Sequence, residues 1–178
     1  APVKVSVPVN MRNYFPSRTL RNFSFFINTG IDPRLGSYDF EEVLRLTHYY
    51  MRYHLNPKFL AAGIATNVAS EKNPFLRLCP LFLKNLIING IFKRVGESGV
   101  TATFTNLGPI AVPPEMTPHL RHLEIILGSA STGRCNCAAA SLGEEMALTF
   151  TRNIRESTLE REMLRFLVRA GIPVLVES

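Results

Sequence analysis

The stretch VTATFTNLGPIAVPPEM, from Val100 to Met116, marks the point where the sequence changes from helical to β-rich patterns. Its first residues carry β-branched side chains at alternate positions, which is typical of a half-buried strand. The pattern then breaks at Asn106-Leu107-Gly108-Pro109 and again at Pro113-Pro114, residue types that favour turns. We therefore expect a strand over Val100–Phe104 and then an elbow, which either only turns the chain or also lines a site.

Two further strands are expected near the start of the chain. Lys4–Val9 alternates polar and apolar residues, and the run RNFSFFIN at Arg21–Asn28 reads as a more buried strand. The sequence opens in this strand pattern without a Met, which we interpret as the mark of a chain cut from a longer one.

Helical spacing begins after Asp39, which is a good N-cap because acidic residues follow it in the first turn. Asn56-Pro57 should end this first helix, and a second one should run to about Ser70. The apolar segment Pro74–Arg94 is interrupted by charged residues and by proline, so we expect a helix packed against a partner rather than a membrane span.

The remaining strands and the last helix follow the elbow. A hairpin turn is expected at Leu142-Gly143-Glu144, and Ser157 and Gly171 should bound the final helix. The expected strands are Leu123–Leu127, Cys135–Ser141 and Met146–Thr151, and the expected helix is Thr158–Arg169. Strands and helices mix without strict βαβ alternation, which predicts an α/β (α+β) fold: a two-layer sandwich of a mixed sheet with helices mainly on one face, in a single lobe over 1–178.

The composition limits the class of protein. The chain has 178 residues, of which 46% are hydrophobic and 19% charged, so it can bury a core. Its net charge of +6 is not gathered in one run, and no nucleic-acid-binding motif is present. We expect no nucleic-acid partner and no membrane span. The three cysteines and the absence of a recognisable secretion signal favour a cytoplasmic protein.

The sequence lacks the motifs that several kinds of functional site require. Cys135 and Cys137 would share one face of a strand, and His119 and His122 form an H-x-x-H pair followed by Glu124. No further ligand at a suitable spacing follows either pair, so we expect core cysteines and no metal site. The chain also has no G-x-S-x-G elbow and no glycine-rich phosphate loop, which argues against serine hydrolases and nucleotide-binding enzymes.

Four polar residues remain as candidates for function. Arg12 follows the first strand and is either a surface charge or a planar fork that fixes a carboxylate. Asn22 lies in the segment before the second strand. Thr105 and Asn106 offer a hydroxyl and an amide at the end of a strand, where such groups can stabilise an oxyanion.

At these residues the sequence resembles a known family. VPVNMRNYFPSRTLRNF followed by TFTNLGPIAVP, and the ending CNCAAASLGEEMALTFTRNIREST, are similar to the C-terminal half of chloramphenicol acetyltransferase-like proteins. This superfamily of coenzyme A-dependent acyltransferases includes condensation domains, and bacterial alcohol O-acetyltransferase-like proteins are the closest in pattern. The likeness covers nearly the whole chain and depends on the order of the motifs, since T-N-L-G alone would be weak.

The resemblance implies a two-lobe enzyme with a tunnel between its lobes. An acyl thioester of coenzyme A or of a carrier protein enters as co-substrate, with no permanently bound cofactor, and a histidine of an H-x-x-x-D-G motif acts as general base. This chain lacks that motif, since Asn28 and Leu35 stand four residues before its only aspartates, Asp32 and Asp39. The resemblance therefore implies the C-terminal lobe of an acyltransferase, inactive alone, whose N-terminal lobe is the missing partner.

The family's roles transfer to four positions. Arg12 matches the arginine that holds the motif aspartate, and Asn22 matches a site near the lobe interface. Thr105 matches the hydroxyl that steadies the oxyanion, although serine is more common there, and Asn106 matches the tunnel wall. The alternative is a non-catalytic, condensation-like binding or scaffold module. An isolated lobe should also expose apolar surface and self-associate.

Overall fold

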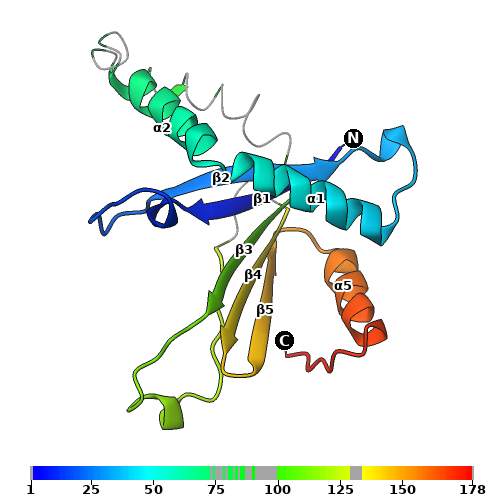
Figure 1. Ribbon diagram of the computed structural model, residues 1–178. Helices are drawn as coiled ribbons and strands as arrows, with labels where there is room; N and C mark the ends of the chain where they lie inside the picture. Colours follow the sequence, from blue (N-terminus) through cyan, green and yellow to red (C-terminus); the bar gives the residue numbers. More distant parts are fainter. Residues whose placement is uncertain are drawn as a thin grey trace. The chain divides into compact units, whose positions relative to one another are not determined.

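The computed structural model describes residues 2–72, 100–128 and 134–177 and, between 73 and 99, residues 74, 78, 80, 81, 83, 85, 86 and 90. Its strands form one five-stranded, mixed and open sheet in the order β2-β1-β3-β4-β5. The α-helices of the described part are α1, α2 and α5 (Figure 1). The expected α/β class with a mixed sheet is confirmed. The chain divides into two compact units, Ala1–Thr105 and Asn106–Ser178, and we describe each by itself.

The first unit is built on an antiparallel pair of strands. β1 (Val3–Asn10) pairs along its whole length with β2 (Ser24–Ile31), and the first residues of β3 (Ala102–Pro109) run parallel to β1. Thr101 fastens this parallel contact, because its amide donates to the Lys4 carbonyl and its hydroxyl accepts from the Lys4 amide. The two strands predicted here are confirmed, but β2 starts at Ser24 because the residues before it belong to a loop.

Helices α1 (Phe40–His54) and α2 (Pro57–Lys72) complete the first unit. Asp39 caps α1 as predicted: its carboxylate accepts from the Glu42 amide at 2.7 Å, and the Glu42 carboxylate accepts from the Asp39 amide at 3.0 Å. This reciprocal capping box satisfies two backbone donors that the helix itself leaves unpaired. The predicted helix Pro74–Arg94 falls mostly outside the described residues.

The core of the first unit is small. Met11, Ile27 and Leu60 are its buried members, so it joins the start of the β1–β2 connection, strand β2 and helix α2. Half-buried residues such as Phe25 and Met51 pack around these three side chains. Each large side chain removed from water here contributes about 1.5–3 kcal/mol, so three of them hold the unit together only with help from the surrounding half-buried residues.

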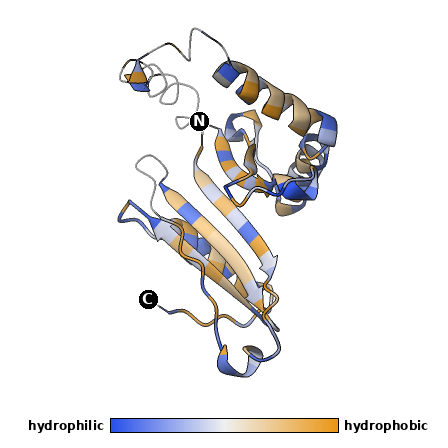
Figure 2. Cartoon of the chain, turned by 90° about the vertical axis from the view of Figure 1, so that its left-hand side faces the viewer, coloured by the Kyte–Doolittle hydropathy of each residue, from blue (hydrophilic) through white to orange (hydrophobic). Residues whose placement is uncertain are grey.

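The second unit contains a hairpin with a tight turn. β4 (Cys135–Leu142) and β5 (Glu145–Arg152) pair antiparallel around Gly143 and Glu144, as predicted. All six residues from Cys135 to Ala140 are buried. Such a run of small residues, buried at every position rather than at alternate ones, is typical of a strand covered on both faces. Hydrophobic residues cover much of the strands in Figure 2.

Helix α5 (Thr158–Arg169) follows the hairpin. Its bounds match the prediction, but the Ser157 side chain makes no capping hydrogen bond. At the other end the Gly171 amide donates to the Val168 carbonyl and the Ile172 amide to the Leu167 carbonyl. These two bonds form a Schellman motif, which satisfies carbonyls at the end of the helix.

One predicted strand is wrong. Leu123–Leu127 alternates half-buried and exposed residues, but it forms no strand. The hydrogen bond that links this segment to β4 comes from a side chain: Asn136 Nδ2 of β4 donates to the Gly128 carbonyl at 3.2 Å. Alternation of burial alone therefore did not bring the backbone into a register with β4. None of the described helices combines the length and hydrophobicity needed to cross a bilayer.

Candidate functional site

The predicted elbow is a kink inside strand β3. The strand continues through Asn106 to Pro109, and the following Ile110 amide donates to the Ser141 carbonyl at 2.8 Å. Gly108 adopts φ +71°, a left-handed conformation that favours glycine. Asn106 Oδ1 accepts from the Gly108 amide at 2.8 Å and braces the kink. The segment therefore bends the strand without reversing the chain.

Thr105 and Asn106 differ in their surroundings. Thr105 is half-buried, and no described residue forms a hydrogen bond with its hydroxyl. Asn106 is exposed, and its side-chain oxygen is occupied by the Gly108 amide, which leaves the Nδ2 hydrogens as donors. Successive residues of a strand point to opposite faces. The two groups are therefore suited to different surroundings, the hydroxyl to a sheltered one and the amide to an open one.

Arg12 lies in the short helix η1 (Met11–Asn13), directly after β1. The Asn10 side chain accepts from the Arg12 amide at 3.1 Å and fixes the start of η1. The Nη2 atom of Arg12 donates to the Thr19 carbonyl at 2.8 Å and to the Arg21 carbonyl at 2.5 Å. The guanidinium is exposed, and its other nitrogens have no hydrogen-bond partner among the described residues. Arg12 thus holds its own loop with one nitrogen and presents the rest of its fork to a further group.

Asn22 belongs to the loop that Arg12 holds. It is exposed and follows Arg21, whose carbonyl accepts from Arg12. The next residue, Phe23, accepts from the Met11 amide at 3.0 Å. The structure therefore brings Arg12 and the Asn22 segment together, whereas no hydrogen bond between described residues links either of them to Thr105.

The cysteines and histidines of the second unit lie in different environments. Cys135 and Cys137 are buried free thiols, and burial raises the pKa of Cys137 to about 11. Their interpretation as core residues is confirmed. His119 ends the short helix η4 (Thr117–His119), whereas Nε2 of His122 lies 3.1 Å from Glu124 Oε1. The two histidines of the H-x-x-H pair therefore lie in different surroundings.

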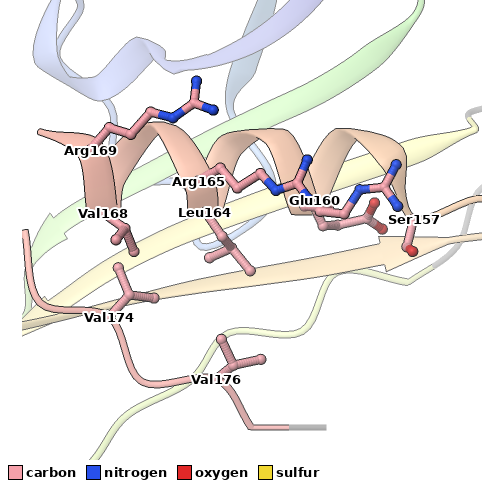
Figure 3. Close-up of a pocket in the computed structure, with 9 residues that line it drawn as sticks. Ser157, Glu160, Leu164, Arg165, Val168, Arg169, Val174 and Val176 are labelled. Atoms are coloured by element: carbon pink, nitrogen blue, oxygen red, sulfur yellow. The ribbon is translucent and has the colours of Figure 1, made fainter.

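A groove in the second unit contains none of the predicted site residues. It measures about 910 Å³ and lies between α5 and the segment that follows it. In Figure 3, Leu164 and Val168 point toward Val174 and Val176, and they form an apolar floor. Arg161, Arg165 and Arg169 line the same groove at a spacing of one helical turn. Sequence reasoning missed this groove because its second wall is an irregular segment without a motif.

A half-buried ion pair joins helix α5, which lines the groove, to the hairpin. Arg152 Nη1 lies 2.7 Å from Glu160 Oε1, and Glu160 is only 9% exposed. Burial raises the pKa of Glu160, but the hydrogen bonds from Arg152 and from the backbone, and the charge of Arg152, outweigh this effect and lower the pKa overall. Glu160 is therefore a structural carboxylate and not a proton donor near neutral pH.

The comparisons with known proteins give no relative. No family model, curated protein or solved structure matches this chain. The chemistry that the chain can offer is therefore defined by its own groups: a hydroxyl on the half-buried Thr105, an amide at Asn106 and an anchored guanidinium at Arg12.

Proposed function

We propose that this chain is the C-terminal lobe of a chloramphenicol acetyltransferase-like acyltransferase. The lobe is a two-layer sandwich with helices mainly on one face of the sheet. The intact enzyme moves an acyl group from a coenzyme A or carrier thioester to an alcohol or amine. The chain has no H-x-x-x-D-G motif, so the general base belongs to the N-terminal partner lobe, and the lobe described here supplies the groups that steady the reaction.

The Thr105 hydroxyl is the observation that carries this proposal. Thr105 is half-buried within β3, near the kink at Gly108, and no described residue forms a hydrogen bond with its hydroxyl. A hydroxyl that forms no hydrogen bond with a described residue can donate to a negative charge that develops on a substrate oxygen. Such donors act most strongly where water is excluded.

Arg12 supports the same function from another direction. Its Nη2 is fixed by the Thr19 and Arg21 carbonyls, while the remaining nitrogens are exposed. A guanidinium held in this way loses little entropy when it pairs with a carboxylate. We propose that Arg12 pairs with the aspartate of the absent catalytic motif. This pair would hold the loop that carries the general base in position.

Helix α1 supports the presence of a partner lobe. Leu46, Tyr49 and Tyr53 lie at spacings of three and four residues and are 50%, 66% and 71% exposed. Phe40 and Leu44 are 57% and 50% exposed on another side of the same helix. Helix α1 thus carries large exposed apolar side chains on more than one side, which is typical of a surface that another body covers.

An acyl-transfer assay on the two-lobe protein tests the proposal. The protein is incubated with acetyl-coenzyme A and a panel of alcohols and amines, and release of the free coenzyme A thiol is followed. We expect turnover with at least one acceptor, and Thr105→Val should lower kcat about 100-fold with little change in KM, because an oxyanion contact acts in the transition state.

The matched control is Thr103→Val, which changes the same chemistry two residues earlier on the same face of β3. It should retain the turnover of the unmodified protein. Equal activity of Thr105→Val and the unmodified protein would remove the oxyanion role. Binding of acyl-coenzyme A without any transfer would instead favour the non-catalytic, condensation-like module.

A further inference from the structure

Three side chains of types that can bind a metal lie close together in the second unit, and none of them has a role in the proposed acyl transfer. His122, Glu124 and Glu177 each place one ligand atom so that all three atoms lie within 4.8 Å of one another. His122 and Glu124 come from the irregular segment before β4, and Glu177 comes from the segment after α5. More than fifty residues of chain therefore separate ligands that the fold brings to one point.

The spacing of these atoms fits a small divalent cation. His122 Nε2 lies 3.1 Å from Glu124 Oε1. Two ligands on a tetrahedral zinc ion, each bound at about 2.0–2.1 Å, lie roughly 3.3 Å apart. The pair therefore has about the separation of two zinc ligands, and a carboxylate oxygen of Glu177 lies within 4.8 Å of both atoms.

A fourth residue behaves as the outer partner of a metal-bound histidine. The other ring nitrogen of His122, Nδ1, lies 3.9 Å from Glu145 Oε2 at the start of β5. A histidine that binds a metal usually turns its second nitrogen toward a carboxylate, which orients the ring and increases its basicity. One imidazole between an inner and an outer carboxylate thus has the arrangement of a metal ligand and its support.

The charge around His122 supports the same reading. The net charge of the whole chain is +6, yet the charged groups facing this ring are the carboxylates of Glu124, Glu177 and Glu145. Three carboxylates around one imidazole attract a cation, and either a proton or a metal ion can occupy that position.

From this geometry we infer that His122, Glu124 and Glu177 form a binding site for a zinc-class divalent cation. The ligands are the imidazole Nε2 and one oxygen of each carboxylate, and Glu145 orients the imidazole. A nitrogen donor combined with two carboxylates suits zinc better than magnesium or calcium, which prefer oxygen ligands alone. Three protein ligands leave a fourth position for water.

The cation would join parts of the chain that share little backbone pairing. Residues 120–128 form no helix or strand, and neither do residues 172–177. Val174 and Val176 of the second segment form the floor of the α5 groove. An ion held between Glu124 and Glu177 would fix both segments and would keep this floor in place.

The test measures zinc bound to the full chain after removal of metals with a chelator. Equilibrium dialysis at micromolar zinc and neutral pH, followed by elemental analysis, should give one zinc per chain that His122→Ala does not retain. Glu124→Gln and Glu177→Gln should each weaken binding at least ~10-fold. All three side chains are exposed, so these variants should keep the circular dichroism spectrum of the unmodified chain.

The sequence provides a matched control in His119→Ala, which removes the other histidine of the H-x-x-H pair and should retain the zinc. Retention of the zinc by His122→Ala, equal loss in His119→Ala, or no binding at micromolar zinc would each overturn the inference.

Discussion

The two antiparallel pairs of the sheet have equal length and different construction. β1 and β2 contain eight residues each, as do β4 and β5. The first pair is joined by the long connection that Arg12 holds, and in β2 buried and exposed residues alternate from Ile27 to Gly30. The second pair is joined by a tight turn at Gly143, and β4 is buried at six positions in succession.

The two strand pairs are therefore stabilised in different ways. The connection between β1 and β2 depends on side-chain bonds to the backbone, and it therefore keeps polar groups such as Arg12 and Asn22 exposed. The β4–β5 hairpin is instead closed by a tight turn, and six successive residues of β4 are buried. Two of the four candidate residues, Arg12 and Asn22, thus lie in the connection of the first pair, as expected for polar groups on a loop that a packed framework supports.

The largest expected effect is on the pairing of β1 and β2. A Cβ added at Gly30 would collide with the Val3 carbonyl oxygen and would lie 2.8 Å from the Lys4 Cα, both on the partner strand. Neither atom can move without shifting the ladder. We expect Gly30→Ala to lower the free energy of unfolding by about 3 kcal/mol, measured by chemical denaturation.

Gly128→Ala is the control for this change, because a Cβ at that position meets no atom within 4 Å. Its effect should stay within about 0.5 kcal/mol. A Gly30→Ala variant as stable as the unmodified protein would show that β1 and β2 can move apart without loss of stability. The proposed difference between the two strand pairs would then be wrong.

The next effect concerns the support of the β4–β5 hairpin. Glu160→Gln should cost about 2 kcal/mol, between the values for buried and exposed ion pairs, because Arg152 is 40% exposed. The pKa of Glu160 is lowered in the folded state, so this stability is present above its ordinary value of 4.5 and is lost as the pH falls through the folded value.

Unfolding measured from neutral pH down to acid should show this loss in the unmodified protein and not in Glu160→Gln. Glu162→Gln is the control on the same helix, since that carboxylate is 54% exposed and its pair with Arg165 contributes little. An identical pH dependence in all three proteins would contradict a stabilising role for the buried pair.

The smallest effect is expected at the β1–β2 connection. Arg12→Ala removes two hydrogen bonds to backbone carbonyls at an exposed position, and should cost about 1 kcal/mol. Limited proteolysis should cut faster between Tyr14 and Asn22, while the strands stay protected. Arg18→Ala removes a charge from the same loop without an ion pair among the described residues, so faster cutting in both variants would mean that charge alone is responsible.

Local patterns allowed most of the second unit to be predicted. The hairpin over Cys135–Thr151 and helix α5 follow from alternation, turn residues and helical spacing, which act over a few residues. Leu123–Leu127 has the same alternation and forms no strand, because pairing with a neighbour is a tertiary property that alternation does not contain. The kink in β3 also departs from the pattern, since Asn106 and Gly108 bend the strand and do not end it.

The candidate residues were predictable in kind but not in arrangement. An arginine after a strand suggests a fork for a carboxylate, but only the structure gives its bonds to Thr19 and Arg21. The H-x-x-H spacing pointed to His119 and His122 as a pair. The fold instead brings one carboxylate oxygen of Glu177 within 4.8 Å of the His122 ring, and no local pattern could indicate a neighbour so distant in the chain.

The burial of β4 also makes its two thiols a chemical reporter. Cys135 and Cys137 face the same side of the strand, and at neutral pH the raised pKa of Cys137 keeps its sulfur protonated and unreactive. Both sulfurs become available to an alkylating reagent only when β4 leaves the sheet. With Cys79 replaced, the rate of alkylation would report the opening of this hairpin alone, and would time it independently of events in the first unit.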